Sequence, residues 1–235
     1  MDSIKAVFFD VGGTLLTPIQ DEGATFSDIA TRMGFEVDPV EVKEKAPQMY
    51  VRYEHAYEQD NSFWNSHDRA KGLWIELYEY MAALLGVPEE AHYKYAEAVY
   101  LFYFSPGAWK AFDDVLPMLD ALTERGLRLG LISNWDSSLA AVIEGLDMTH
   151  YFETIIASAD VAMHKPNHEI FDLALDRFGI EANEAMHVGD HLHADAIGAN
   201  DAGLCGVLLD RKGKYPDFEG HRVASLMEIL DILDL

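Results

Sequence analysis

From residue 105 onward, short apolar runs alternate with stretches in which apolar residues recur every three or four positions. Short apolar runs are typical of buried strands, and the longer spacing is typical of amphipathic helices. The predicted strands are 4–9, 127–132, 154–157, 185–188 and 206–209, and the predicted helices are 115–125, 138–146, 168–178, 194–202 and 226–230. Strands that alternate with helices form parallel sheets, so we expect an α/β fold built on a doubly wound parallel sheet.

Residues 17–104 follow a different pattern, because helical spacing continues there without a strand-like run. The predicted helices are 25–33, 38–59, 73–85 and 88–102, and Pro47 predicts a kink or a break in the second. The first strand belongs with the later ones, so four or five helices are inserted after it. We therefore expect a catalytic core formed by residues 1–16 and 105–235, and a helical domain formed by residues 17–104.

The charge of the chain restricts its partners. Its 235 residues carry 41 acidic and 17 basic side chains, which gives a formal net charge of −24. Such a field repels nucleic acid and anionic membranes, so we expect a small-molecule substrate and neither of those partners. An anionic substrate would need a cation inside the site. The sequence does not indicate the oligomeric state.

Location is predicted from three further features. No apolar run approaches the about 20 residues of a membrane span, and Met1–Lys5 lack the charged and apolar regions of a signal peptide. The single cysteine, Cys205, excludes an intramolecular disulfide and lies in an apolar stretch. We expect a cytoplasmic protein with an inert, buried thiol.

Polar residues follow the predicted strands where each strand ends. Asp10 ends the first apolar run and precedes Gly12-Gly13-Thr14, and Ser133-Asn134, Lys165 and Gly189-Asp190 follow later in the same order as the strands. Chemistry in an open parallel sheet gathers at these carboxyl ends. A carboxylate beside a glycine turn, whose backbone N–H groups can approach an anion, suits a nucleophile that accepts a phosphoryl group.

Over essentially its whole length, this order of motifs resembles the haloacid dehalogenase-like hydrolase superfamily, subfamily I with a helical C1 cap. The motifs are Phe8–Leu15, Gly130–Asp136, Lys165-Pro166 and Val188–Asp190, with Asp195 five residues beyond the last. The resemblance implies a Rossmann-like core with an inserted all-helical cap domain. It also implies hydrolysis through an aspartyl ester intermediate.

The resemblance implies a role for each motif residue. Asp10 would be the nucleophile, Ser133 and Asn134 would belong to the second catalytic motif, and Lys165 would supply positive charge. Ser133 and nearby backbone N–H groups would hold the oxygens of the transferred group.

A metal site is implied as well. Asp10 and Asp190 would share Mg²⁺, and the carbonyl oxygen of Gly12 would be a third protein ligand. Asp195 would hold a metal-bound water or brace the Lys165 loop. His191 and His193 flank the site, and we expect them to face solvent or the cap rather than a metal.

Gly12 departs from the family pattern, because phosphatases of this family usually carry an aspartate there. That aspartate transfers protons, which commonly contributes ~10²–10⁴ in rate. The leading interpretation is a Mg²⁺-dependent phosphatase acting on a small ester with a good leaving group. Asp136, His164 or a metal-bound water would then replace the missing acid.

Three alternatives remain open at this point. A 2-haloacid dehalogenase expels halide and needs no acid. A phosphonoacetaldehyde hydrolase uses a cap lysine as a Schiff base, and the cap lysines here are Lys43, Lys45, Lys71 and Lys94. A catalytically weak member would bind or regulate rather than turn over substrate.

Overall fold

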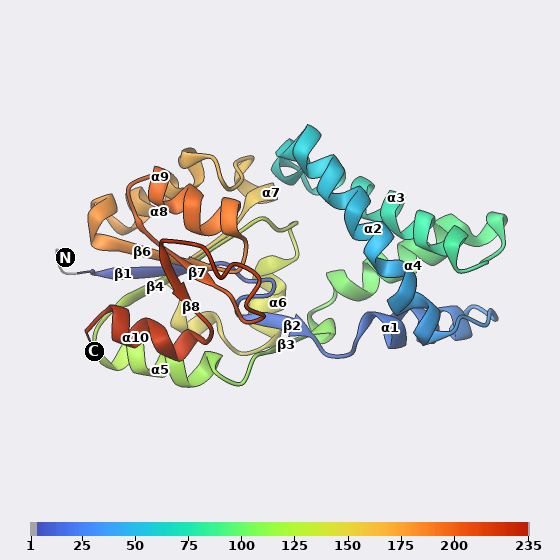
Figure 1. Cartoon of the computed structure of the whole chain (residues 1–235), viewed down its shortest axis with the longest axis horizontal. Helices are drawn as coiled ribbons and strands as arrows, with labels where there is room; N and C mark the ends of the chain where they lie inside the picture. Colours follow the sequence, from blue (N-terminus) through green and yellow to red (C-terminus); the bar gives the residue numbers. More distant parts are fainter. Residues whose placement is uncertain (1–3, 235) are drawn as a thin grey trace.

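The computed structural model describes residues 4–234. Met1, Asp2 and Ser3, which were part of the segment considered as a signal peptide, lie outside the described residues. A helix-flanked sheet forms one part of the molecule, and a group of helices forms the other (Figure 1). None of the described helices is both long and apolar enough to cross a bilayer.

The main sheet has six parallel strands in the order β5-β4-β1-β6-β7-β8. Their bounds are β1 Ala6–Phe9, β4 Arg128–Ser133, β5 Thr154–Ala157, β6 Ala185–Gly189, β7 Cys205–Leu209 and β8 His221–Val223. The chain builds outward from β1 through β4 to β5, and then through β6 to the other edge. The order in which successive strands are added therefore reverses between β1 and β6. Ligands of α/β sheets bind at such a reversal, at the carboxyl ends of the strands. The predicted doubly wound α/β fold is confirmed, and β8 is a strand that the sequence analysis missed.

Both faces of the sheet are buried, as the continuous apolar runs predict. Ala6 and Phe8 face α8 (His168–Phe178) and α9 (Gly198–Asp201) on one side. Val7 and Phe9 join the other core cluster, which contains residues of α5 (Val115–Glu124), α6 (Leu139–Gly145) and α10 (Ile229–Ile232). With both faces covered, the carboxyl edge of the strands is the place where polar side chains can meet.

Two predicted core helices differ from the structure in form. The segment predicted as a helix over 194–202 is a π-helix, Leu192–Ile197, that continues into α9. The segment predicted over 226–230 begins as a 3-10 turn, Leu226–Glu228, before α10. A short helix after β5, α7 (Ser158–Val161), was not predicted.

The helical unit consists of α1 to α4, with a 3-10 helix, Asn61–Asn65, between the second and the third. The helices are α1 Glu22–Arg32, α2 Pro39–Gln59, α3 His67–Leu84 and α4 His92–Phe104. They enclose a hydrophobic cluster of their own, in which Met81, Tyr95 and Val99 are fully buried. Tyr95 Oη donates a hydrogen bond to the carbonyl of Phe26 at 2.8 Å, which satisfies the buried hydroxyl.

Helix α2 continues through Pro47 without the break that the sequence analysis allowed. Proline removes the N–H that would bond the carbonyl four residues earlier, at Lys43. Both Lys43 and Pro47 are exposed, so water can replace that bond. The predicted start is confirmed, because Asp38 caps the helix by accepting a hydrogen bond from Val40 N at 2.8 Å.

A two-stranded antiparallel ribbon connects the two parts of the molecule. It pairs β2 (Leu16–Pro18) with β3 (Trp109–Ala111), so both passages of the chain between the parts lie side by side. The predicted domain division at residues 16 and 105 stays a prediction; β2 spans the first boundary, and β3 begins shortly after the second.

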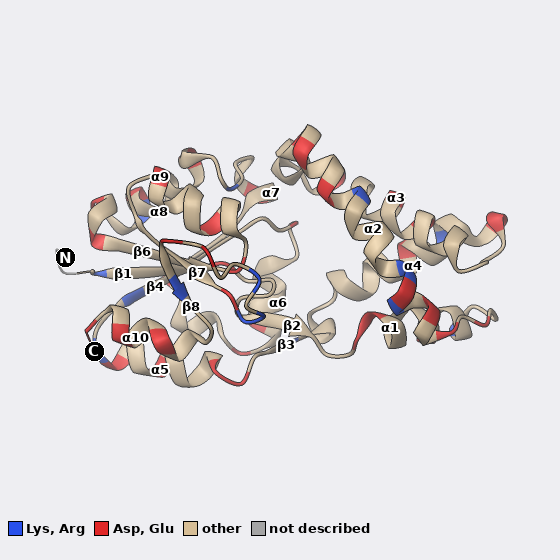
Figure 2. Cartoon of the chain, viewed as in Figure 1, with Lys and Arg blue, Asp and Glu red and all other residues tan. Residues whose placement is uncertain are grey.

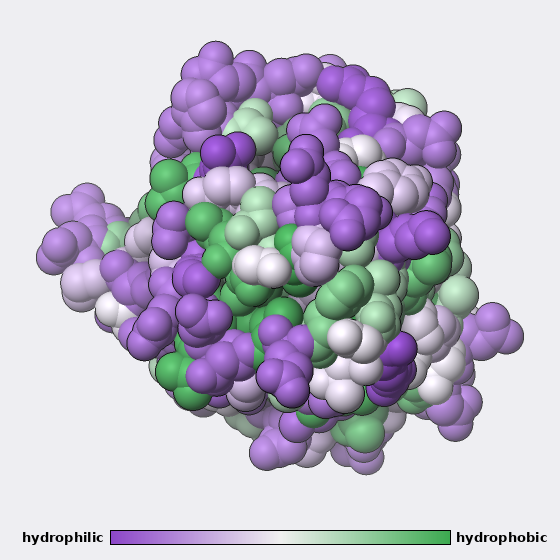
Figure 3. All heavy atoms as spheres, turned by 90° about the vertical axis from the view of Figure 1, so that its right-hand side faces the viewer, coloured by the Kyte–Doolittle hydropathy of each residue, from purple (hydrophilic) through white to green (hydrophobic). Residues whose placement is uncertain are grey.

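The surface reflects the acidic composition. Acidic side chains lie on both parts of the molecule and outnumber basic ones (Figure 2). Seen from the side of the helical unit, hydrophilic side chains surround a smaller apolar area (Figure 3).

Candidate active site

Asp10 directly follows β1 and lies at the carboxyl edge of the sheet with only 7% of its surface exposed. Ser133, the last residue of β4, donates from Oγ to Asp10 Oδ1 at 2.9 Å. Lys165 Nζ donates to the same oxygen at 2.8 Å. Two donors on one oxygen fix the rotation of the carboxylate.

Lys165 is the cation of this cluster and is 1% exposed. Its Nζ bonds Asp10 at 2.8 Å and Asp195 Oδ1 at 2.5 Å. Burial alone would lower the pKa of Lys165, but the two carboxylates outweigh burial and raise that pKa, so the ammonium stays charged. Among the described residues that line the cavity over Asp10, Lys165 is the only lysine or arginine.

Asn134 acts on the main chain of Lys165. Its Nδ2 donates to the Lys165 carbonyl at 2.9 Å, and its Oδ1 accepts from Lys165 N at 2.8 Å. This reciprocal pair fixes the backbone that carries the ammonium. Asn134 is therefore placed to position Lys165, in addition to lining the cavity.

Asp195 is fully engaged by neighbours. Oδ1 accepts from Lys165 and lies 3.0 Å from His187 Nε2, and Oδ2 accepts from His191 N at 2.9 Å. Burial would raise the pKa of Asp195, but Lys165 and His187 hold it well below its usual range. A Cβ at Gly189 would lie 2.2 Å from Asp195 Cγ, so glycine is required where this carboxylate crosses the strand end. Of the two roles inferred for Asp195, these bonds favour bracing Lys165.

His187 is a site neighbour that the sequence analysis missed. It is completely buried in β6, and its ring packs edge-on against Phe171 at 5.3 Å. Burial lowers the pKa of His187, which favours the neutral ring. The available signal was one polar residue in the otherwise apolar run 185–188.

Asp190 follows β6, beside Asp10 on the neighbouring strand. Gly13, at φ +77°, lets the loop pass so close that a Cβ there would lie 2.4 Å from Asp190 Oδ2. Desolvation by the surrounding protein, followed by the charges of Asp10 and Asp195, raises the pKa of Asp190 to about 7, even though one side of it reaches solvent.

The three carboxylates fit a divalent cation. Carboxylate oxygens of Asp10, Asp190 and Asp195 all lie within 4.8 Å of one another. When ionised, they carry three negative charges against the one positive charge of Lys165. Hard cations such as Mg²⁺ prefer oxygen ligands of this kind, so the residues present fit such an ion.

A cavity of about 210 Å³ lies over this cluster and is called the Asp10 cavity below. The core contributes the carboxylates, Gly12, Ser133 and Lys165, and the helical unit contributes Tyr53, Tyr57 and Trp64. The helical spacing of these aromatic residues is typical of a core, yet all three line the cavity. His191 lines it too, with its ring 5.6 Å from that of Tyr57, whereas His193 is not among the lining residues.

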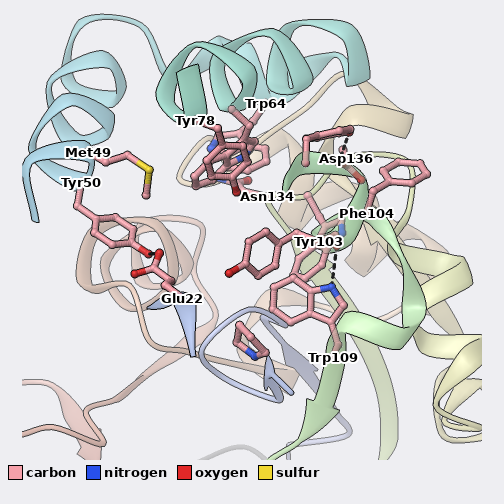
Figure 4. Close-up of a pocket in the computed structure, with 14 residues that line it drawn as sticks. Glu22, Met49, Tyr50, Trp64, Tyr78, Tyr103, Phe104, Trp109, Asn134 and Asp136 are labelled. Carbon is pink, nitrogen blue, oxygen red and sulfur yellow. Dashed lines mark hydrogen bonds between the residues drawn. The ribbon is translucent and has the colours of Figure 1, made fainter. Parts of the chain in front are cut away.

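A second cavity, also about 210 Å³, adjoins the first and is called the aromatic cavity below (Figure 4). The two share Trp64, Asn134 and Trp135. Most of its other lining residues are aromatic, among them Tyr50, Trp74, Tyr78, Tyr103, Phe104 and Trp109. Tyr100 also lies there, although it is mainly bonded to Asp136.

The two side chains considered as replacements for a general acid are occupied elsewhere. Asp136 accepts hydrogen bonds from Tyr100 Oη at 2.7 Å and from both the backbone N and Oγ of Ser138 at 2.9 and 2.6 Å. His164 lies 2.7 and 2.8 Å from the amide oxygens of Asn65 and Asn61 and lines neither cavity. Asp136 thus works as an acceptor, and His164 as a contact between the two parts of the molecule.

Among the described residues that line the two cavities, the four lysines of the helical unit are absent. Lys43 pairs with Asp21 at 3.2 Å, and Lys45 pairs with Glu41 at 3.2 Å. The structure therefore brings no lysine of 17–104 to the Asp10 cavity in the position that Schiff-base chemistry needs.

Comparison with known proteins agrees with the motifs. The family model of haloacid dehalogenase-like hydrolases matches residues 4–203. The chain is 30% identical over 215 residues to haloacid dehalogenase-like hydrolase domain-containing protein 3 of Danio rerio, covering 89% of this chain and 86% of that protein. It is 33% identical over 153 residues to a glyceraldehyde 3-phosphate phosphatase of Methanopyrus kandleri, covering 57% and 63%. In fold, it is similar to a solved dehalogenase, with a TM-score of 0.72, 21% identity, and coverage of 99% and 98%.

Proposed function

The chain belongs to the haloacid dehalogenase-like hydrolase family, and from this premise we propose that it is a Mg²⁺-dependent phosphatase acting on a small phosphate ester. The observation that carries the proposal is the placement of Asp10. Its carboxylate faces a cavity and accepts hydrogen bonds from Ser133 and Lys165. A second carboxylate, that of Asp190, directly follows the neighbouring strand β6. Residues 17–104 act in this proposal as the cap domain.

The proposed reaction has two steps on Asp10. A carboxylate oxygen attacks phosphorus, the P–O bond to the alcohol breaks, and an aspartyl phosphate forms. Water then attacks that phosphorus, which releases phosphate and restores the carboxylate. Lys165 offsets the charge of the phosphoryl oxygens in both steps, and Ser133 Oγ keeps the nucleophile aligned.

Asp10 and Asp190 are proposed as the side-chain ligands of the metal, with the Gly12 carbonyl beside them. Asp195, whose oxygens already accept three hydrogen bonds, holds Lys165 or a metal-bound water. When bound, Mg²⁺ would offset the repulsion between carboxylates and polarise a phosphoryl oxygen.

Removal of the metal is the first test. A chelator should abolish hydrolysis of 4-nitrophenyl phosphate, and added Mg²⁺ should restore it. Because the ion binds the folded state, saturating Mg²⁺ should raise the melting temperature of the native protein. Asp190→Asn should lose both responses, because it removes a charged ligand.

Asp201→Asn is the matched control, since it makes the same chemical change at an exposed residue of α9. It should keep both the Mg²⁺ requirement and the thermal shift. Full activity in chelator, together with no thermal response to Mg²⁺, would contradict the metal proposal and favour dehalogenase-like chemistry.

Gly12 should make the rate depend steeply on the leaving group. No proton donor stands two residues after Asp10, so aryl phosphates should turn over much faster than alkyl phosphates. Gly12→Asp should flatten that dependence and raise alkyl phosphate hydrolysis about 10-fold. Gly12 does not need a positive φ, but a Cβ there would lie 3.2 Å from Trp135 Cζ3, so the ring must shift slightly.

The control for this test is Gly12→Asn, which has the same shape but no transferable acid. It should show the packing cost at Trp135 without the gain on alkyl phosphates. A flat leaving-group dependence in the native protein would mean that another group already supplies the proton. Tyr57 would then be the first side chain to change, because it lines the Asp10 cavity from the helical unit and carries a hydroxyl.

Gly12 also supports a second candidate function, 2-haloacid dehalogenation. Halide leaves without a proton, so a glycine at this position costs that reaction nothing. A panel of phosphate esters, phosphonoacetaldehyde and 2-haloacids, measured with and without Mg²⁺, separates the candidates. Metal-independent halide release with no phosphate release would replace the phosphatase proposal.

A further inference from the structure

The aromatic cavity contains an unusual concentration of rings next to the proposed phosphoryl site. All four tryptophans of the chain line it, namely Trp64, Trp74, Trp109 and Trp135. The rings hold one another in place: those of Trp109 and Trp135 lie 4.8 Å apart, and those of Trp74 and Tyr78 stack at 5.6 Å. Such walls favour a flat or apolar group, and their faces attract cations.

The charged residues of this cavity are all acidic. Among the described residues that line it there is no lysine or arginine, whereas Glu22 and Asp136 are both present. Asp136 already accepts three hydrogen bonds from Tyr100 and Ser138. Glu22 is bonded by one phenol, Tyr50, and is half-buried. Glu22 is therefore the carboxylate with capacity for a ligand.

Glu22 and Tyr50 lie on one side of the cavity, away from Asp136 (Figure 4). Tyr103 lies between Asp136 and the pair of Glu22 and Tyr50, and its hydroxyl points towards that pair (Figure 4). That hydroxyl is buried and makes no well-formed hydrogen bond to a described residue. Burial raises the pKa of Tyr103 to about 12, so its oxygen remains a neutral acceptor and donor. The far end of the cavity thus offers the carboxylate of Glu22, while the Tyr103 hydroxyl is buried within the wall.

We infer that the aromatic cavity binds the alcohol part of the substrate. This part is an apolar or aromatic body that ends in a protonated amine, which pairs with Glu22. The inference rests on the proposed phosphatase function. The ester would cross the boundary formed by Trp64, Asn134 and Trp135, which both cavities share. An alcohol ending in a carboxylate is disfavoured, because it would meet Glu22 without a countercharge.

The test uses three phenyl phosphates with closely similar leaving groups. They carry at the para position a 2-aminoethyl, an ethyl or a 2-carboxyethyl chain, so that the main difference is the terminal group, which is an ammonium, a methyl or a carboxylate. We expect kcat/KM to be about 10-fold higher for the ammonium ester than for the ethyl ester, and lowest for the carboxylate ester. In Glu22→Gln, the ratio of ammonium to ethyl ester should fall towards one.

Glu76→Gln is the matched control, because it removes one negative charge at an exposed position of α3. It should keep the ratio of the native protein, which separates local pairing at Glu22 from the overall charge of the chain. Equal kcat/KM values for the three esters in the native protein, or a preference for the carboxylate ester, would overturn the inference while leaving the phosphatase proposal intact.

Binding of the product phenols gives a readout that does not require turnover. Tryptophan fluorescence reports on it directly, since every tryptophan of the chain lines this cavity. We expect 4-(2-aminoethyl)phenol to bind more tightly than 4-ethylphenol and 3-(4-hydroxyphenyl)propionate. If no ester is hydrolysed, the phosphatase proposal fails, and the order of the three phenols still decides the inference about the cavity.

Discussion

Asp10→Asn should lower phosphatase kcat by at least about 10³-fold, because an amide oxygen cannot replace the attacking carboxylate. The variant keeps the shape of the side chain, so Ser133 and Lys165 retain an oxygen to bond. We therefore expect a folded protein that binds substrate without turning it over. Steady-state hydrolysis of 4-nitrophenyl phosphate and thermal unfolding measure the two parts of this result.

Asp231→Asn, at an exposed position of α10, provides the comparison for the loss of one carboxylate far from the site. It should leave kcat unchanged. Beryllofluoride, which mimics a phosphoryl group, should protect the native protein against thermal unfolding and fail to protect Asp10→Asn. Near-native turnover by the asparagine variant would remove Asp10 from the role of nucleophile.

Lys165→Met should destabilise the fold by about 3–5 kcal/mol, because it leaves the buried carboxylates of Asp10 and Asp195 without their cation. Urea unfolding at neutral pH measures this cost. The pKa of Asp195 is depressed in the folded state, so the stabilisation from its pairing is present above the unfolded pKa and is lost as pH falls further. The difference between native protein and variant should therefore shrink below about pH 4.

The double variant Lys165→Met with Asp195→Asn isolates the pair. Removing both partners should restore part of the lost stability, because less unpaired charge remains buried, while activity stays low. Equal stability of Lys165→Met and the native protein at neutral pH would mean that the ion pair contributes nothing to the fold.

The sheet and its strand ends were predictable because burial on both faces imposes continuous apolar runs. The run 4–9 predicts β1, and its end places Asp10 at the sheet edge without any knowledge of the neighbouring strands. Strands β2, β3 and β8 escaped prediction because each has three residues, which is too short for a recognisable period. Pairing with a partner distant in sequence, rather than local pattern, stabilises them.

The surroundings of the site were less predictable, for two physical reasons. A helical repeat shows which residues turn inward, but not whether they meet another helix or a cavity, so Tyr53 and Trp74 have the same pattern as core residues. A buried polar residue also gives no sign of its partner. Asp136 was a candidate acid from its position, and only the structure shows Tyr100 and Ser138 bonded to its oxygens.

The core and the helical unit meet at several places besides the ribbon, including Tyr100 Oη on Asp136 Oδ2 at 2.7 Å and Ser137 Oγ beside His67 Nδ1 at 3.0 Å. The β2·β3 ribbon carries both chain passages, and the 3-10 helix Asn61–Asn65 meets α7 and His164 elsewhere (Figure 1). A movement of the helical unit away from the core would have to break these contacts, the His164 contacts among them, while the ribbon keeps the two parts connected. Tyr53 and Tyr57, which line the cavity from α2, would move together with the helical unit. Substrate entry and phosphate release would then depend on the contacts between the two parts as well as on the chemistry at Asp10.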